Sequence, residues 1–211
     1  MIIKIIVLFL ILTVPLLAIP LNKSLVIDIT QTYSYCKAQI YVLEAIKDKF
    51  PNLEKKVFIT KSQFDSSFSS SLKNIDKIMN QYKDWKDYKL KTNKTLKNSF
   101  DFSDMTYKNA IIFIDTVKAR AKGKIESPVL ETLLMFNPEY EKHPETEFND
   151  GFIKKYKCDD LKKSKGVDFS IDIPMSWASK KANRPNIVRK FISYNGNGLV
   201  MAMIAILYVE I

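Results

Sequence analysis

The spacing of apolar residues changes along this chain, from steps of three and four residues over most of its length to steps of two near the end. Between Ile29 and Phe50 the apolar side chains recur at the helical spacing, and Pro51 follows directly. Such a stripe is typical of an amphipathic helix, and proline disfavours helical backbone in the residue before it. We therefore predict a helix that ends near residue 50.

A second apolar stripe predicts one long helix from about Asn52 toward Tyr88. The opposite face of this segment carries mainly lysine and aspartate, which indicates a solvated surface and a buried phenylalanine stripe. The stripe consists of Phe64, Phe68, Leu72, Ile75, Met79 and Tyr82.

Two shorter helices are predicted downstream by their end signals. Ser103 or Asp104 can cap a helix that runs to Gly123, because a basic last turn followed by glycine is a common helix stop. Ser127 and the proline after it form an N-cap and first-turn pair, and Pro138 follows the apolar run that they open. The first part of the chain is therefore predicted to be helical.

Beyond this helical part the pattern changes first to loop and then to strand. The polar stretch 137–151 contains two prolines and predicts a loop. After Gly166, apolar and polar residues alternate up to Pro174, which predicts a strand with one buried face. Residues 187–194 and 199–209 predict two more strands, with Asn-Gly-Asn-Gly between them as a hairpin turn.

Together these patterns predict an α+β fold, with a helical N-terminal bundle followed by a small antiparallel β-sheet domain. The predicted divisions are a leader at 1–19, a helical domain at 20–151, a basic linker at 152–165 and a β domain at 166–211. The last predicted strand is apolar throughout, and the sequence stops two residues after it. We therefore expect that the β domain is truncated or that a partner covers this strand.

The leader is predicted from an apolar run, Ile5 to Leu12, behind a single lysine. This is the pattern of an export signal, with Ala18 as the residue before the cleavage site. Leu16 occupies a position where such sites prefer a small residue, so an uncleaved membrane anchor of about 20 residues is the alternative. Both outcomes predict an exported protein, which is periplasmic or secreted after cleavage and membrane-anchored without it.

The formal net charge of +10 comes almost entirely from lysine, because only three of the 33 basic residues are arginines. Nucleic-acid binders more often place arginine on one clustered face, so this composition argues against a nucleic-acid partner. A solvated lysine surface is the simpler interpretation. One cluster would permit weak electrostatic contact with anionic lipid headgroups: Lys154, Lys155, Lys157, Lys162, Lys163 and Lys165.

Two cysteines, Cys36 and Cys158, are present in the chain. An even count in an oxidising compartment permits one disulfide between them. Cys36 also lies on the apolar face of the first predicted helix, so a buried free thiol is the alternative. Two cysteines without CxxC spacing and a single histidine do not make a zinc site.

No catalytic, cofactor-binding or metal-ligating residue is predicted. His143 lies in a polar loop, without a serine or cysteine motif that would complete a triad. Glycine is too sparse for a phosphate-binding loop, and pairs such as Glu145 and Glu147 arise by chance among 23 acidic residues. The sequence therefore favours a non-enzymatic protein without a cofactor.

The alternating segment after Gly166 leads into Pro174, Ser176 and Trp177. With the Asn-Gly-Asn-Gly turn and the apolar strand that follow, it resembles the opening of PsbP/Mog1-like domains, in which a strand ends in Pro-x-x-Trp and leads to an antiparallel sheet. The resemblance covers residues 167–211, and the later strands and helix of such domains have no counterpart here. It implies a binding or assembly module, and no functional residue carries over from it.

We therefore expect an exported binding or assembly protein whose protein partner meets the C-terminal apolar strand. Two alternatives stay open: an exported hydrolase whose site assembles from scattered polar residues, and a secreted effector that contacts membranes through its basic surface. Buried carboxylates clustered in a cleft would favour the hydrolase, and salt-sensitive vesicle binding would favour the effector.

Overall fold

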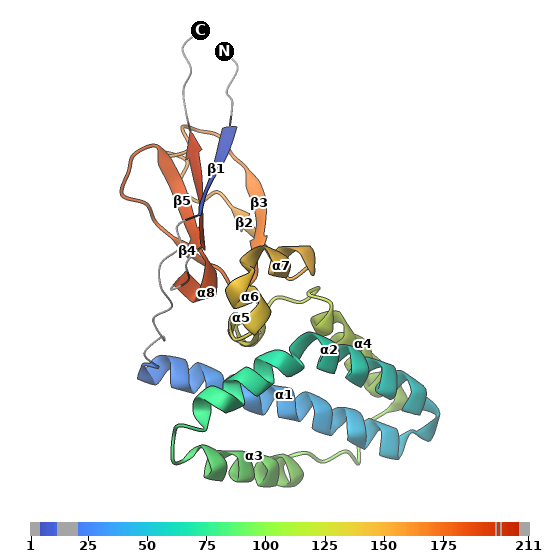
Figure 1. Ribbon diagram of the computed structural model, residues 1–211. Coiled ribbons are helices and arrows are strands. Elements are labelled where there is room, and N and C mark those ends of the chain that lie inside the picture. Colours follow the sequence, from blue (N-terminus) through green and yellow to red (C-terminus); the bar gives the residue numbers. More distant parts are fainter. Residues whose placement is uncertain (1–4, 12–20, 197, 199, 207–211) are drawn as a thin grey trace. The chain divides into compact units, whose positions relative to one another are not determined.

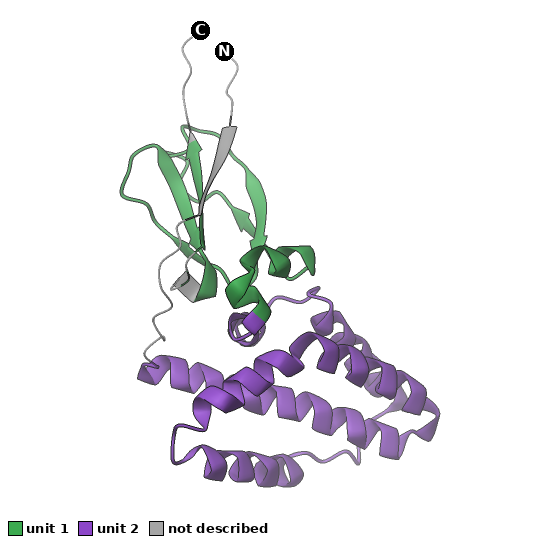
Figure 2. Ribbon diagram, viewed as in Figure 1, with its two compact units in different colours: residues 1–20, 139–211 green, residues 21–138 purple. Residues whose placement is uncertain are grey.

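The computed structural model describes residues 5–11, 21–196, 198 and 200–206. It confirms the α+β class, with a helical N-terminal part followed by small antiparallel sheets (Figure 1). The chain divides into a helical unit, residues 21–138, and a sheet unit that contains the residues from Glu139 onward (Figure 2). The N-terminal strand belongs to the sheet unit as well. The division after residue 138 differs from the predicted one after residue 151.

The helical unit has a core of stacked apolar stripes. Helix α2 packs against α4, and α1 packs against α2 and α5. Most of the predicted phenylalanine stripe is part of this core: Phe64 and Phe68 are buried and their rings meet edge to face with centroids 5.0 Å apart, whereas Tyr82, predicted as its last member, is 42% exposed. The elements are α1 (Lys23–Lys49), the 3-10 helix η1 (Pro51–Leu53), α2 (Glu54–Met79), α3 (Trp85–Ser99), α4 (Tyr107–Ala121) and α5 (Pro128–Met135).

Side-chain caps fix where several helices begin. The Asn22 side chain accepts a hydrogen bond of 2.9 Å from the first turn of α1. Ser127 caps α5 as predicted, and its hydroxyl accepts a backbone hydrogen bond of 3.3 Å. Helix α4 is capped by Thr106, not by Ser103 or Asp104, because the chain turns at those two residues before the helix starts.

The single helix predicted toward residue 88 is wrong, because residues 80–84 form a turn between α2 and α3. Trp85 is 2% exposed, and its ring lies edge to face with that of Tyr33 on α1, with centroids 4.9 Å apart. The Asp76 carboxylate accepts hydrogen bonds from the Trp85 indole at 2.8 Å and from Lys89 at 2.6 Å. Burial of a tryptophan side chain therefore stabilises the reversal of the chain.

The sheet unit contains two antiparallel sheets, with strand orders β1-β6-β5-β4 and β2-β3. Both sheets contribute to one core, which includes Ile173, Phe191 and Ile204. The helices of this unit are α6 (Pro138–Lys142), α7 (Pro144–Asn149) and α8 (Ser193–Gly196). The strands are β1 (Ile5–Ile11), β2 (Ile153–Lys157), β3 (Ser170–Pro174), β4 (Ala178–Lys180), β5 (Ile187–Ile192) and β6 (Val200–Ile206).

These elements correct two predicted segments, the loop 137–151 and the linker 152–165. The predicted loop 137–151 contains α6 and α7, both of which have proline at the first position. The predicted basic linker 152–165 begins with β2, which pairs with β3 from Ile153 opposite Pro174 to Lys157 opposite Ser170. The paired strand supplies the hydrogen bonds that make this lysine-rich segment extended.

The predicted hairpin does join β5 and β6, but α8 forms its turn. The backbone N–H of Gly198 donates to the carbonyl of Ser193 at 2.8 Å, and Tyr194 has a positive φ of 53°. A Cβ atom at residue 198 would lie 2.0 Å from the Ser193 hydroxyl oxygen, so only glycine fits there. Residues 197 and 199, and residues 207–209 of the last predicted strand, lie outside the described residues.

Candidate interaction sites in the sheet unit

Strand β6 is apolar at every position and lies between β5 and β1. On one edge it pairs antiparallel with β5. On its other edge it pairs antiparallel with β1 over seven residues, from Ile5 opposite Ile206 to Ile11 opposite Val200. The strand that occupies this second edge therefore belongs to the segment predicted as a leader.

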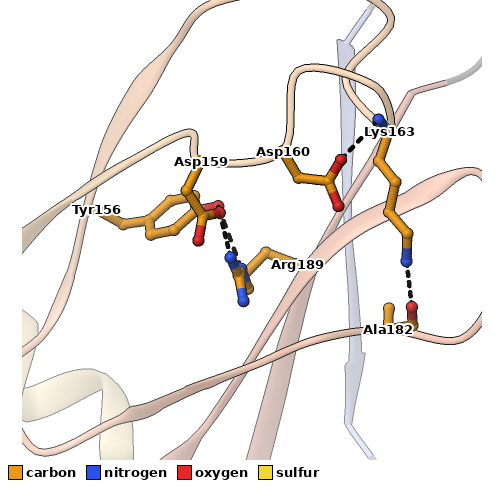
Figure 3. A network of polar contacts seen from close by, with 6 residues as sticks. All are labelled: Tyr156, Asp159, Asp160, Lys163, Ala182 and Arg189. Carbon is orange, nitrogen blue, oxygen red and sulfur yellow. Dashed lines mark hydrogen bonds and ion pairs between the residues drawn. The ribbon is translucent and has the colours of Figure 1, made fainter.

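A polar network connects the end of β2 with β5 (Figure 3). The Arg189 guanidinium donates through Nη2 to the Asp159 carboxylate and through Nε to the Tyr156 hydroxyl, the latter at 3.2 Å. The Tyr156 hydroxyl in turn donates to Asp159 at 2.7 Å. Arg189 is 6% exposed, and its guanidinium carbon lies 5.5 Å from the centre of the Tyr156 ring. The network therefore joins the two sheets through a buried cation.

The charge of Asp159 depends on the same contacts. Its pKa is lowered, first by the hydrogen bond from Arg189 and next by that from Tyr156. The Asp159 side chain is 58% exposed, whereas that of Arg189 is 8% exposed. Solvent therefore reaches the carboxylate but hardly reaches the guanidinium, and Asp159 is the main compensation for a buried positive charge.

The turn after this network, residues 160–166, is held by further hydrogen bonds. The Asp160 carboxylate accepts from the backbone N–H of Lys163 at 3.0 Å, and the Lys163 ammonium group donates to the carbonyl of Ala182 (Figure 3). Ser164 is fully buried. Gly166 closes the turn with a φ of 81° and donates its N–H to the Leu161 carbonyl at 2.8 Å. The turn therefore has a fixed conformation.

The outer side of this turn is basic with one apolar side chain. Leu161 is 54% exposed, and Lys162 and Lys165, which follow it in sequence, are exposed as well. Lys157 at the end of β2 is exposed as well. The six lysines predicted as one cluster are therefore in different environments. Lys155 pairs with Asp172 at 2.9 Å, the Lys163 ammonium group binds the Ala182 carbonyl, and Lys154 is half-buried. Lys157, Lys162 and Lys165 are exposed.

A second buried polar contact joins α7 to the residues after β3. Glu147 is fully buried and Ser176 is 5% exposed. The backbone N–H of Ser176 donates to the Glu147 carboxylate at 2.6 Å, and the Ser176 hydroxyl donates to its other oxygen. Burial raises the pKa of Glu147 to about 7, although both hydrogen bonds favour the charged form. These hydrogen bonds therefore hold the Pro174–Trp177 segment against α7.

The two cysteines are free thiols in the structure, so the disulfide predicted between Cys36 and Cys158 is not formed. Cys36 is 1% exposed in the core of the helical unit, and Cys158 is 8% exposed in the core of the sheet unit. Burial raises the pKa of Cys36 to about 12, which keeps this thiol protonated. Each sulfur atom is packed among apolar side chains of its own unit.

His143 lies at the surface, where its imidazole is 3.7 Å from the Glu145 carboxylate. Among the described residues, no three histidine, cysteine or carboxylate side chains are grouped so that they could hold a metal ion. None of the helices in the described part of the chain has the length and apolar character needed to cross a membrane.

The sequence patterns did not point to Arg189, Asp159 or Glu147 as members of a buried polar contact. Arg189 had one usable signal, because it alternates with Phe191 on a strand and must then share the face that Phe191 buries. Glu147 had none, since its partner Ser176 is 29 residues away in sequence.

Comparison of this chain with protein-family models, curated proteins and solved structures found no match.

Proposed function

We propose that this chain is an exported, non-enzymatic binding or assembly protein that accepts a partner's strand along the edge of β6. The observation that carries this proposal is the antiparallel pairing of β6 with residues 5–11. These residues lie within the predicted leader, residues 1–19, so cleavage of the leader would leave the edge of β6 without a neighbour.

An uncovered edge of this kind is a binding surface because its backbone N–H and C=O groups lack partners. Strand addition satisfies these groups, and alternate side chains of the added strand provide specificity. The Pro174–Trp177 segment supports the same class of function, because its resemblance to PsbP/Mog1-like domains implies a binding or assembly module. The partner is a protein of the compartment to which the chain is exported.

The proposal is tested by isolating the protein from an exporting host and sequencing its N-terminus. The mature protein is then titrated with a labelled peptide that contains residues 4–12, and binding is followed by fluorescence anisotropy. The matched control is the same peptide with Leu8→Pro, because proline removes a backbone N–H and is excluded from the middle of a sheet.

We expect a mature protein that lacks the leader and that binds the first peptide in preference to the proline-containing peptide. Retention of residues 1–19 in the mature protein would contradict the proposal. Equal binding of both peptides would also contradict it, because the interaction would then be nonspecific apolar adhesion and not strand pairing.

A further inference from the structure

The turn at residues 160–166 carries exposed side chains that take no part in the hydrogen bonds that hold it. The polar groups on its inner side are all occupied, since Asp159 binds Arg189, Asp160 binds the backbone of Lys163, and the Lys163 ammonium group binds a carbonyl. Figure 3 shows these contacts at the start of the turn and at Lys163. The hydrogen bonds that hold the turn therefore use the backbone of Leu161, Lys162 and Lys165 but not their side chains.

The three exposed side chains of the turn combine one apolar group with two cations. Leu161 is 54% exposed, and Lys162 and Lys165 are exposed, with no hydrogen bond or ion pair of their ammonium groups among the described residues. Of the three aspartates nearby in sequence, Asp159 pairs with Arg189, Asp160 accepts a backbone hydrogen bond inside the turn, and Asp168 is exposed, so one exposed aspartate stands against Lys157, Lys162 and Lys165. The exposed charge here is therefore positive.

We infer that this turn, together with Lys157, is a docking surface for a membrane that contains anionic lipids. The lysine ammonium groups would lie at the level of the lipid phosphates, and Leu161 would enter the boundary between headgroups and acyl chains. The fixed turn favours this contact, because residues that are already ordered lose little conformational entropy on binding. The surface is separate from the edge of β6 and does not depend on the proposed strand addition.

The protein offers a matched comparison on α2. Lys55 and Lys56 are exposed there, and Phe58 is 72% exposed, so this helix also combines two lysines with an apolar side chain. A contact that depends only on net charge and exposed apolar area would use the α2 residues as readily as the turn. Variants of the two sites therefore separate a specific surface from a general property of the protein.

The test measures co-sedimentation of the purified mature protein with phosphatidylcholine vesicles that contain or lack phosphatidylglycerol. The double variant Lys162→Ala/Lys165→Ala should bind the anionic vesicles about thirtyfold more weakly, at roughly 1 kcal/mol for each lysine. Leu161→Ala should weaken binding about tenfold, because roughly half of the leucine side chain is available for transfer. Lys55→Ala/Lys56→Ala should bind like the unaltered protein.

A fluorescence variant keeps the inference testable if sedimentation is weak. Leu161→Trp adds an exposed indole, whereas Trp85 and Trp177 are only 2% and 4% exposed. Its emission should shift to shorter wavelength with anionic vesicles at low ionic strength and return in high salt, because screening weakens the lysine contacts. Absence of the shift, equal binding to vesicles without phosphatidylglycerol, or an equal loss in the α2 variant would each overturn the inference.

Discussion

Replacement of Glu147 by glutamine should remove a pH dependence from the stability of the sheet unit. Glu147 is fully buried and accepts hydrogen bonds from the backbone N–H and the hydroxyl of Ser176. Glutamine can accept from the same N–H through Oε1 and can donate to the hydroxyl through Nε2. The substitution therefore keeps the contact between α7 and the segment after β3 and removes only the ionisable group.

The magnitude follows from the pKa of this carboxyl group. Burial raises the pKa from an ordinary value of 4.5 to about 7 in the folded protein. At pH values below 4.5 both the folded and the unfolded states are protonated, so the fold has its full stability. As the pH rises from about 4.5 to about 7, the carboxyl group ionises first in the unfolded state, which stabilises that state, and the free energy of unfolding falls by about 3 kcal/mol.

The assay is urea unfolding at about pH 5 and about pH 8, followed by Trp177 fluorescence in a Trp85→Phe background so that the signal reports on the sheet unit. Other charged groups nearby, including Lys154 and the Tyr140–Asp150 pair, are the same in both proteins and cancel in the comparison. The parent should lose about 2.5 kcal/mol between the two pH values, because the unfolded state is already partly ionised at about pH 5, and Glu147→Gln should not lose this increment. Equal losses in both proteins would refute the reasoning.

Three further predictions concern the other contacts. Asp159→Ala should destabilise the sheet unit by about 3 kcal/mol in urea unfolding, because it leaves the buried Arg189 cation uncompensated. Arg189→Met should destabilise it by about 1 kcal/mol or less, because it removes the buried cation itself. A larger loss for Arg189→Met than for Asp159→Ala would contradict the assigned network. Gly198→Ala should lower the free energy of unfolding of the sheet unit by roughly 1–3 kcal/mol. Adding Ser193→Gly should restore only part of this loss, because the Ser193 backbone carbonyl oxygen also lies 2.7 Å from the new Cβ atom. Full recovery of stability would show that only the Ser193 hydroxyl clashes with the new side chain. Cys36 and Cys158 are buried free thiols, so both should react with a thiol reagent only after the protein is unfolded, which gives two thiols per chain. If the unfolded protein had no reactive thiol, the two cysteines would form a disulfide.

The sequence predicted those elements whose signals are local. Residues near Pro51 and Ser127 determine helix ends through backbone sterics and capping, and the structure has those ends. The strand before Pro174 was predicted from its period of two. Each of these signals acts within a few residues, so a single sequence contains all the information that is needed.

The elements that were missed depend on distant partners. Strand β2 is lysine-rich, and it becomes a strand because β3 pairs with it from residues 13 or more positions away. The apolar stripe in the sequence continues through residues 80–84, but the chain turns there. The turn forms because the Trp85 indole packs against Tyr33 on α1 and donates a hydrogen bond to Asp76 on α2. The Glu147–Ser176 and Arg189–Asp159 contacts likewise join segments 29 and 30 residues apart.

The central claim, that the mature protein accepts a strand on the edge of β6, is tested most directly by hydrogen exchange. Amide exchange is measured for residues 200–206 in the mature protein, with and without the peptide of residues 4–12. We predict that alternate β6 amides, those that face away from β5, exchange rapidly alone and become protected when the peptide is added. Unchanged exchange in β6 at a saturating concentration of peptide would contradict the account.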